Sequence, residues 1–174
     1  MDSTGLEKKL WSVDISHVDM TNEKQIASTL GIELHFICDN SETVKLAESV
    51  DLLFIDSLHV YGHLKRELDF HHSNVKQYII MHDTSIDGWQ GELVRKSEET
   101  IDWIEIQRQY GYLQYSQEDL LLGLLPAVEE FLELHSEWKL EKHFANNNGL
   151  TILKRVLPTV GIHEASGFAY SWHP

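Results

Sequence analysis

The sequence is poor in cysteine and in long apolar runs, and each shortage excludes a class of protein. Its 174 residues include one cysteine, Cys38, which rules out an intramolecular disulfide and a cysteine-based zinc cage. Cys38 lies in an apolar run and is expected to be a buried core thiol. No segment approaches membrane-spanning length, and residues 1–9 lack the apolar stretch of a signal peptide. We therefore expect a cytoplasmic protein.

Basic residues are also scarce. The chain has 14 Lys and Arg against 28 Asp and Glu, which gives a formal net charge of -14. Nothing supplies the basic stripe that neutralises a nucleic-acid backbone, and an anionic membrane surface would repel this charge. The expected partners therefore include neither a nucleic acid nor a membrane. The acidic balance does not identify a substrate.

Two strand ends carry the residues that point most directly to chemistry. The run DLLFIDSLHVY at 51–61 is apolar until it reaches Asp56, and YIIMHDT at 78–84 is apolar until it reaches His82 and Asp83. Each run is typical of a buried parallel strand, and the segment between them is long enough for one crossover helix. In an open α/β sheet, neighbouring carboxyl ends of this kind form the usual place for a ligand or metal.

Strand-like and helix-like segments alternate through the first half of the chain, which predicts an α/β fold with a mostly parallel sheet. After residue 84 the pattern changes to an insertion at about 89–125, a helix with Pro126 in its first turn, and an antiparallel hairpin. We predict one domain over 1–157 and assign no structure to the tail at 158–174. The predicted strands are 10–15, 32–38, 51–56, 78–82, 138–144 and 150–155, and the predicted helices are 21–30, 41–50, 62–75 and 126–135.

This order of motifs resembles the class I S-adenosylmethionine-dependent methyltransferases. The residues that carry the resemblance are the strand ends at Asp14 and Asp39, then FIDSLHVYG, IIMHDT, AVEEFL and the hairpin ending GLTILKR. The chain is most similar to the small-molecule O-methyltransferase branch with the cephalosporin-hydroxylase relatives, whose motifs are "FIDGDHxY" and "HDT". The resemblance covers about residues 10–155 and implies a Rossmann-like sheet, with S-adenosylmethionine as cofactor.

The resemblance assigns cofactor-binding roles to four residues. Asp14 matches the acid that binds the ribose hydroxyls, and Asp39 matches the position beside the adenine. Ser41 and Asp56 complete this set. The residues themselves allow other readings, because Asp14 could be an ordinary strand-end cap, Asp39 could form an Asx turn with the next residue, and Ser41 could cap a helix.

The resemblance also implies a metal and a base. Asp56 and Asp83, joined by His82, match the set that holds a divalent ion, and hard carboxylate oxygens suit Mg2+ better than zinc. His59 matches a general base that would take the proton of a substrate hydroxyl. The alternatives are a helix cap for Asp83 and a hydrogen-bonded surface histidine for His59. His71 and His72 lie late in a predicted helix, where imidazoles interact favourably with the C-terminal end of the helix dipole, with a metal site as the alternative.

The chain departs from the family in two places. Residues 1–9 cannot supply the first strand and its glycine-rich loop, so the sheet is expected to be incomplete at its N-terminal side. The absent strand would lie centrally, between the strands that end at Asp14 and Asp56. Either the strands pair anew, or a partner chain donates a strand, or the protein is a fragment of low stability. Ser57 and Leu58 replace the family's Gly-Asp before His59.

Three functions follow from these observations. The first is metal-assisted O-methyl transfer from S-adenosylmethionine to a small hydroxylated acceptor. The alternative is a non-catalytic methyltransferase-like fragment or one half of a split assembly, which would need a second copy or a strand-donating partner. A metal-dependent hydrolase that uses Asp56, His82 and Asp83 ranks last, because no nucleophile motif accompanies these residues.

Overall fold

The computed structural model describes residues 7–96 and 114–156, which belong to two compact units, Met1–Glu48 and Ser49–Pro174. The predicted single domain over 1–157 stays a prediction, and the tail and the middle of the insertion lie outside the described residues. Within those two described ranges no helix has both the length and the apolarity to cross a membrane. The cytoplasmic location likewise stays a prediction.

The first unit is a single β-α-β element. Strands β1 (Lys8–Asp14) and β2 (Ile32–Cys38) pair in parallel, with Lys8 opposite Ile32 and Asp14 opposite Cys38. Helix α1 (Thr21–Thr29) connects them and ends before Gly31, whose φ of 68° suits glycine. Cys38 is exposed at the end of β2, so the prediction of a buried thiol is wrong. Its Sγ atom lies 3.7 Å from the carbonyl oxygen of Ile15.

The predicted helix at 41–50 is also wrong. The carbonyl of Asn40 accepts hydrogen bonds from the amides of Thr43 and Val44, which closes one turn and no more. The side-chain oxygen of Asn40 accepts from the amide of Glu42, so side-chain bonding replaces the continuing helical ladder. Two β-branched residues in succession add to this preference. Ser41 therefore lies in a turn instead of capping a helix.

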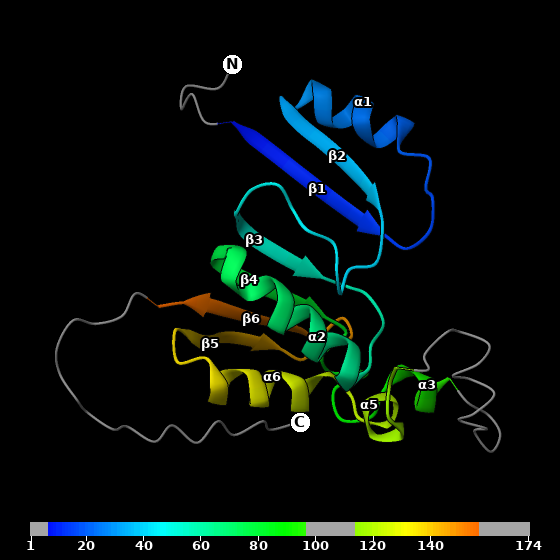
Figure 1. Ribbon diagram of the computed structural model, residues 1–174, viewed down its shortest axis with the longest axis vertical. Coiled ribbons are helices and arrows are strands. Elements are labelled where there is room, and N and C mark those ends of the chain that lie inside the picture. The colour runs from blue at the N-terminus through cyan, green and yellow to red at the C-terminus, as the bar shows by residue number, and fades with distance from the viewer. Residues whose placement is uncertain (1–6, 97–113, 157–174) are drawn as a thin grey trace, which may run out of the picture. The chain divides into compact units, whose positions relative to one another are not determined.

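The second unit holds a four-stranded sheet in the order β3-β4-β6-β5 (Figure 1). Strands β3 and β4 are parallel, whereas β6 is antiparallel to both β4 and β5, so the C-terminal hairpin is confirmed. The elements of this unit are β3 (Val50–Ile55), α2 (Tyr61–His71), the 3-10 helix η1 (His72–Asn74), β4 (Val75–His82), α3 (Glu92–Arg95), α5 (Gln117–Leu121), α6 (Leu124–Leu134), β5 (Trp138–Phe144) and β6 (Leu150–Arg155).

Helices α2 and α6 pack side by side on one face of this sheet (Figure 1). Their apolar residues recur at helical spacing, as Leu64 and Leu68 do in α2, so one stripe of each helix faces the strands. Pro126 occupies the first turn of α6, as predicted. The core between the layers contains Ile55, Leu64, Leu68, Val75, Ile79, Met81, Leu124, Ala127, Val128, Phe131, Trp138 and Leu153.

The predicted α/β fold class is confirmed, with parallel strand pairs followed by an antiparallel hairpin. Each parallel pair has an open edge, because no further strand pairs with β1 or with the second edge of β3 within 7–96 and 114–156. Leu52 and Phe54 of β3 are 48% and 53% exposed. An open edge beside exposed apolar side chains is a surface on which another strand can pair.

Candidate functional site

The two predicted strand ends lie side by side in the second unit. Ile55 of β3 pairs with Met81 of β4, and this register brings the following residues to the same edge of the sheet. His82 Nδ1 lies 3.6 Å from Asp56 Oδ1 and 3.0 Å from Asp83 Oδ1. The sequence prediction that these acids meet at one edge is therefore reproduced by the strand register.

His59 lies among three carboxylates. Its Nε2 atom is 3.2 Å from Asp56 Oδ1, and its Nδ1 atom is 3.3 Å from Asp83 Oδ2 and 3.1 Å from Asp87 Oδ2. The side chain of His59 is only 12% exposed, so its contacts with Asp83 and Asp87 are shielded from bulk water, whereas Asp56 is 47% exposed. We call Asp56, His59, Asp83 and Asp87 the acidic cluster.

Asp87 is the member that sequence reasoning missed. It follows a turn-like run and carries no motif, yet its side chain is fully buried. Arg95 of α3 donates two hydrogen bonds to it, at 2.5 Å from Nε and 2.9 Å from the terminal nitrogen. These bonds raise the pKa of Arg95. A buried carboxylate that is paired on one side with arginine can hold the His59 ring on the other.

The backbone at Asp83 is held in an unusual conformation. Its φ is 57°, a left-handed value that aspartate tolerates better than most residues. The amides of Ser85 and Ile86 donate to the carbonyl of Asn148 in the β5–β6 turn, at 2.8 and 2.9 Å. Beside them the hydroxyl of Thr151 donates to that of Thr84, at 2.9 Å, and both residues are fully buried. The hairpin therefore fixes the segment that follows Asp83.

The acidic cluster can hold a divalent cation. Asp56, His59 and Asp83 each offer one ligand atom, and these atoms lie within 4.8 Å of one another. Asp83 Oδ1 is buried and accepts no hydrogen bond from the described residues. His82 Nδ1 lies 3.0 Å away, but this contact is an ion pair and lacks the geometry of a hydrogen bond. An orphaned carboxylate oxygen of this kind fits a metal ligand. His82 lies beside the group but is not one of its three members.

The proton positions on His59 lead to the same conclusion. Nδ1 faces two carboxylate oxygens, so we assign it a hydrogen that is donated to Asp87. In a neutral ring Nε2 is then a bare acceptor that faces Asp56 Oδ1, which is also an acceptor. A cation between the two atoms would satisfy this geometry. When no cation is bound there, Nε2 is the ring atom that can take up a proton.

The residues predicted to bind the cofactor base and ribose belong to the first unit. The amide of Asp39 donates to the carbonyl of Asp14 at 3.0 Å, so the two residues are neighbours at the ends of β1 and β2. Asp14 Oδ1 accepts from the amide of Ser16, and Asp39 Oδ1 from that of Asn40, both at 2.7 Å. Both acids are exposed. Ser41 follows in the turn described above.

No family model and no curated protein sequence matches this chain. Solved structures of similar fold include the PH0226 protein from Pyrococcus horikoshii OT3, at a TM-score of 0.49 and 16% identity over 85% of this chain and 74% of that one. Magnesium protoporphyrin IX methyltransferase (ChlM) from Synechocystis PCC 6803 with bound SAH gives 0.48 and 8%, over 84% and 63%. OxaC in complex with SAH and oxaline gives 0.44 and 11%, over 88% and 37%. This chain thus spans little more than a third of the length of OxaC, and at these scores we draw no functional argument from the likeness.

Proposed function

We propose that this chain is a class I S-adenosylmethionine-dependent methyltransferase that methylates a hydroxyl group of a small acceptor. The observation that supports the proposal best is the acidic cluster, in which Asp56 and Asp83 follow adjacent parallel strands and His59 lies within 3.3 Å of both. The motifs that resemble the family, FIDSLHVYG and IIMHDT, also predict a site at this edge of the sheet. Their oxygens and the His59 ring form a concentrated set of proton acceptors.

Each member of the cluster has a role in this proposal. Asp56 and Asp83 would hold a magnesium ion, which when bound lowers the pKa of a coordinated hydroxyl and fixes its orientation. His59 Nε2 takes the hydroxyl proton, while Asp87 holds Nδ1 and so keeps the ring in the tautomer that can accept it. S-adenosylmethionine, when bound, would supply the methyl group to the deprotonated oxygen, and its sulfur would be the leaving group.

The cofactor is assigned to the predicted set. Asp14 is proposed to bind the ribose hydroxyls, because its second carboxylate oxygen remains available when the first accepts from Ser16. Asp39 is proposed to lie against the adenine amine, and Ser41 and Asp56 remain proposed cofactor contacts, each within its own unit. Ser57 and Leu58 leave the site without the family's second acid, so Asp87 would supply the charge that orients His59.

Calorimetric titration with S-adenosylhomocysteine, with and without Mg2+, tests this function. We expect binding by the full chain, a weaker affinity in Asp14→Asn, and an effect of Mg2+ that disappears in Asp83→Asn while the cofactor affinity persists. Asparagine tolerates the left-handed backbone at position 83, so this variant should keep its fold. The absence of any binding by a folded chain would overturn the proposal.

The second candidate is a non-catalytic half of a split assembly, which a specific observation favours. The open edge of β3 exposes Leu52 and Phe54, and a strand donated by a partner chain would cover it. Hydrogen exchange of the β3 amides together with light scattering tests this idea. Slow exchange of the β3 amides that face away from β4, appearing only on mixing with a co-purifying partner, would support it. A monomer that binds S-adenosylhomocysteine and keeps these outward-facing amides in rapid exchange would contradict it.

A further inference from the structure

A second group of metal-ligating side chains lies at the other end of helix α2. His72 follows α2 directly, His135 follows α6 directly, and Glu137 precedes β5. The Nδ1 atoms of both histidines lie 3.6 Å from Glu137 Oε1. We call these three residues the histidine cluster. None of them belongs to the acidic cluster or to the predicted cofactor set.

We propose that the histidine cluster binds a divalent transition-metal ion of the zinc class. Its three ligand atoms lie within 4.8 Å of one another. Around a tetrahedral zinc ion with bonds of about 2.0–2.1 Å, neighbouring ligand atoms are separated by about 3.4 Å. The observed separations from Glu137 Oε1 are 3.6 Å, so an ion could bind with small movements of the rings.

An unsatisfied buried atom provides independent support. His72 Nδ1 is buried and has no hydrogen-bond partner among the described residues, and 3.6 Å to Glu137 is too long for a hydrogen bond. A buried ring nitrogen without a partner costs free energy. A metal ion between His72, His135 and Glu137 would give His72 Nδ1 a partner and would also be bound by the carboxylate of Glu137.

Aromatic packing fixes the positions of the two histidine rings. Phe131 of α6 lies against both rings, with centroid distances of 5.5 Å to His72 and 4.5 Å to His135. Burial is the main cause that lowers the pKa of His72, and the charges of His135 and Arg155 lower it further. Glu137 and Asp69 act in the opposite direction.

Charges of both signs lie near the site, and the choice of ion follows from the types of ligand. The guanidinium of Arg155 donates to the carbonyls of His72 and Val75 and lies over the Trp138 ring at 4.6 Å, so its charge opposes a cation. The negative ends of the α2 and α6 helix dipoles favour a bound cation. Two imidazoles and one carboxylate bind zinc or cobalt far better than magnesium. A water would complete the coordination shell.

Calorimetric titration of the full, chelator-treated chain with zinc chloride tests the proposal. We expect one equivalent to bind, an affinity at least about tenfold weaker in His135→Gln, and an unchanged affinity in His35→Gln, a control at an exposed histidine outside the cluster. Asp83→Asn should keep this equivalent, which separates it from any zinc bound by the acidic cluster. If His135→Gln does not fold, Glu137→Gln replaces it.

Cobalt supplies a second readout, because its visible absorption reports the coordination geometry and the ligand field of the bound ion. We expect a cobalt band in the wild type that zinc displaces and that His135→Gln and Glu137→Gln both weaken. Unchanged zinc affinity in both cluster variants would overturn the proposal, and so would loss of the zinc equivalent in Asp83→Asn.

Discussion

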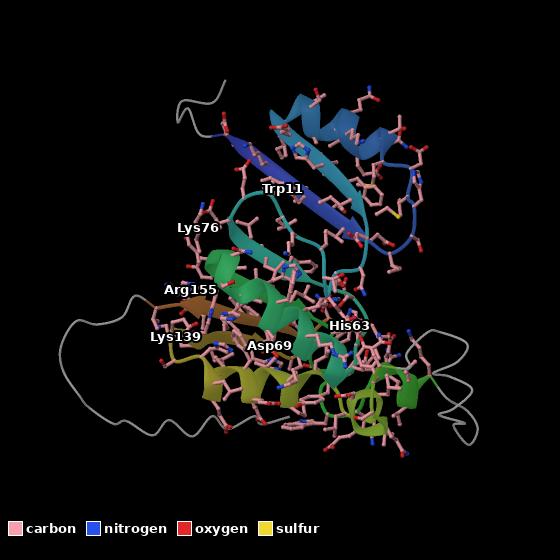
Figure 2. The ribbon with its side chains drawn as sticks, in the orientation of Figure 1. Trp11, His63, Asp69, Lys76, Lys139 and Arg155 are labelled. Atoms are coloured by element: carbon pink, nitrogen blue, oxygen red, sulfur yellow. The ribbon has the colours of Figure 1, made fainter. Side chains whose placement is uncertain are left out.

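The two clusters lie next to opposite ends of one helix, and they are built differently. His59 precedes α2 and His72 follows it, across a helix of 11 residues. Figure 2 shows His63 and Arg155, which mark these two ends, toward opposite ends of the four-stranded sheet. Carboxylates gather at the positive end of the helix dipole, whereas imidazoles gather at the negative end, so the dipole favours the charge that each cluster carries or attracts.

The clusters also differ in how their polar atoms are satisfied. Asp87 in the acidic cluster is fully buried and bonded on both sides, to Arg95 and to His59. In the histidine cluster the contacts are 3.6 Å long and a buried nitrogen has no partner. Asp83 Oδ1 in the acidic cluster also lacks a hydrogen-bond partner among the described residues. The acidic cluster is nevertheless anchored by the bonded carboxylate of Asp87, whereas the carboxylate of the histidine cluster, Glu137, makes only long contacts. The predictions below test this difference.

The largest effect is expected when the acidic cluster loses its buried charge. Asp87→Asn weakens the hydrogen bonds from Arg95 and His59 to a fully buried carboxylate, and the loss of hydrogen bonds to a charged group costs about 3 kcal/mol of unfolding free energy. Urea denaturation of the variant and the wild type measures the difference. Asp51→Asn is the control, because Asp51 is 69% exposed and its contact with Lys76 is 3.5 Å long, so it should cost less than about 1 kcal/mol. Equal losses in the two variants would contradict the comparison.

A smaller loss is expected at the buried threonine pair that supports Asp83. Thr84→Val removes the acceptor for the hydroxyl of Thr151, which then keeps only His143 Nδ1 as a partner, and the loss of one buried hydrogen bond costs about 1 kcal/mol. The double variant Thr84→Val/Thr151→Val removes both hydroxyls and should recover part of this loss. Urea unfolding of both single variants and the double variant gives the coupling energy. Strict additivity would show that the two hydroxyls do not act together.

The sequence predicted the acidic cluster in part, and physical reasons explain the remainder. Asp56 and Asp83 end apolar runs, and parallel strands bring such ends together. Asp87 and Arg95 meet only because α3 folds back over the turn, and no periodic pattern encodes that contact. The histidine cluster joins residues 72 and 135 through the packing of two helix ends. Short-range patterns predict helices and strands, but they do not predict which loop ends meet.

Without metal, the histidine cluster should tolerate the loss of its carboxylate. Glu137 is 35% exposed, and its contacts with both rings are long, so Glu137→Gln should cost less than about 1 kcal/mol in chelator. Urea denaturation in the presence of a chelator measures this cost, with Asp87→Asn as the matched variant at the other end of α2. A loss as large as that of Asp87→Asn would show that the protein already stabilises the histidine cluster without an ion.

The smallest effect concerns the pH dependence of stability near the hairpin. Burial lowers the pKa of His143 in the folded protein below its usual 6.5. The unfolded chain therefore binds the proton first as the pH falls through 6.5, so this residue lowers stability toward acid pH and has no effect above that range. Unfolding free energies measured between about pH 5 and about pH 8 should rise less steeply with pH in His143→Gln than in the wild type.

The comparison should be made between slopes, because the variant also loses the contact of His143 Nδ1 with Thr151 Oγ1 at 2.9 Å, which shifts the curve at every pH. Parallel curves would show that His143 titrates alike in the folded and the unfolded chain. The hydrogen bond between Thr84 and Thr151 would then not depend on the protonation of His143.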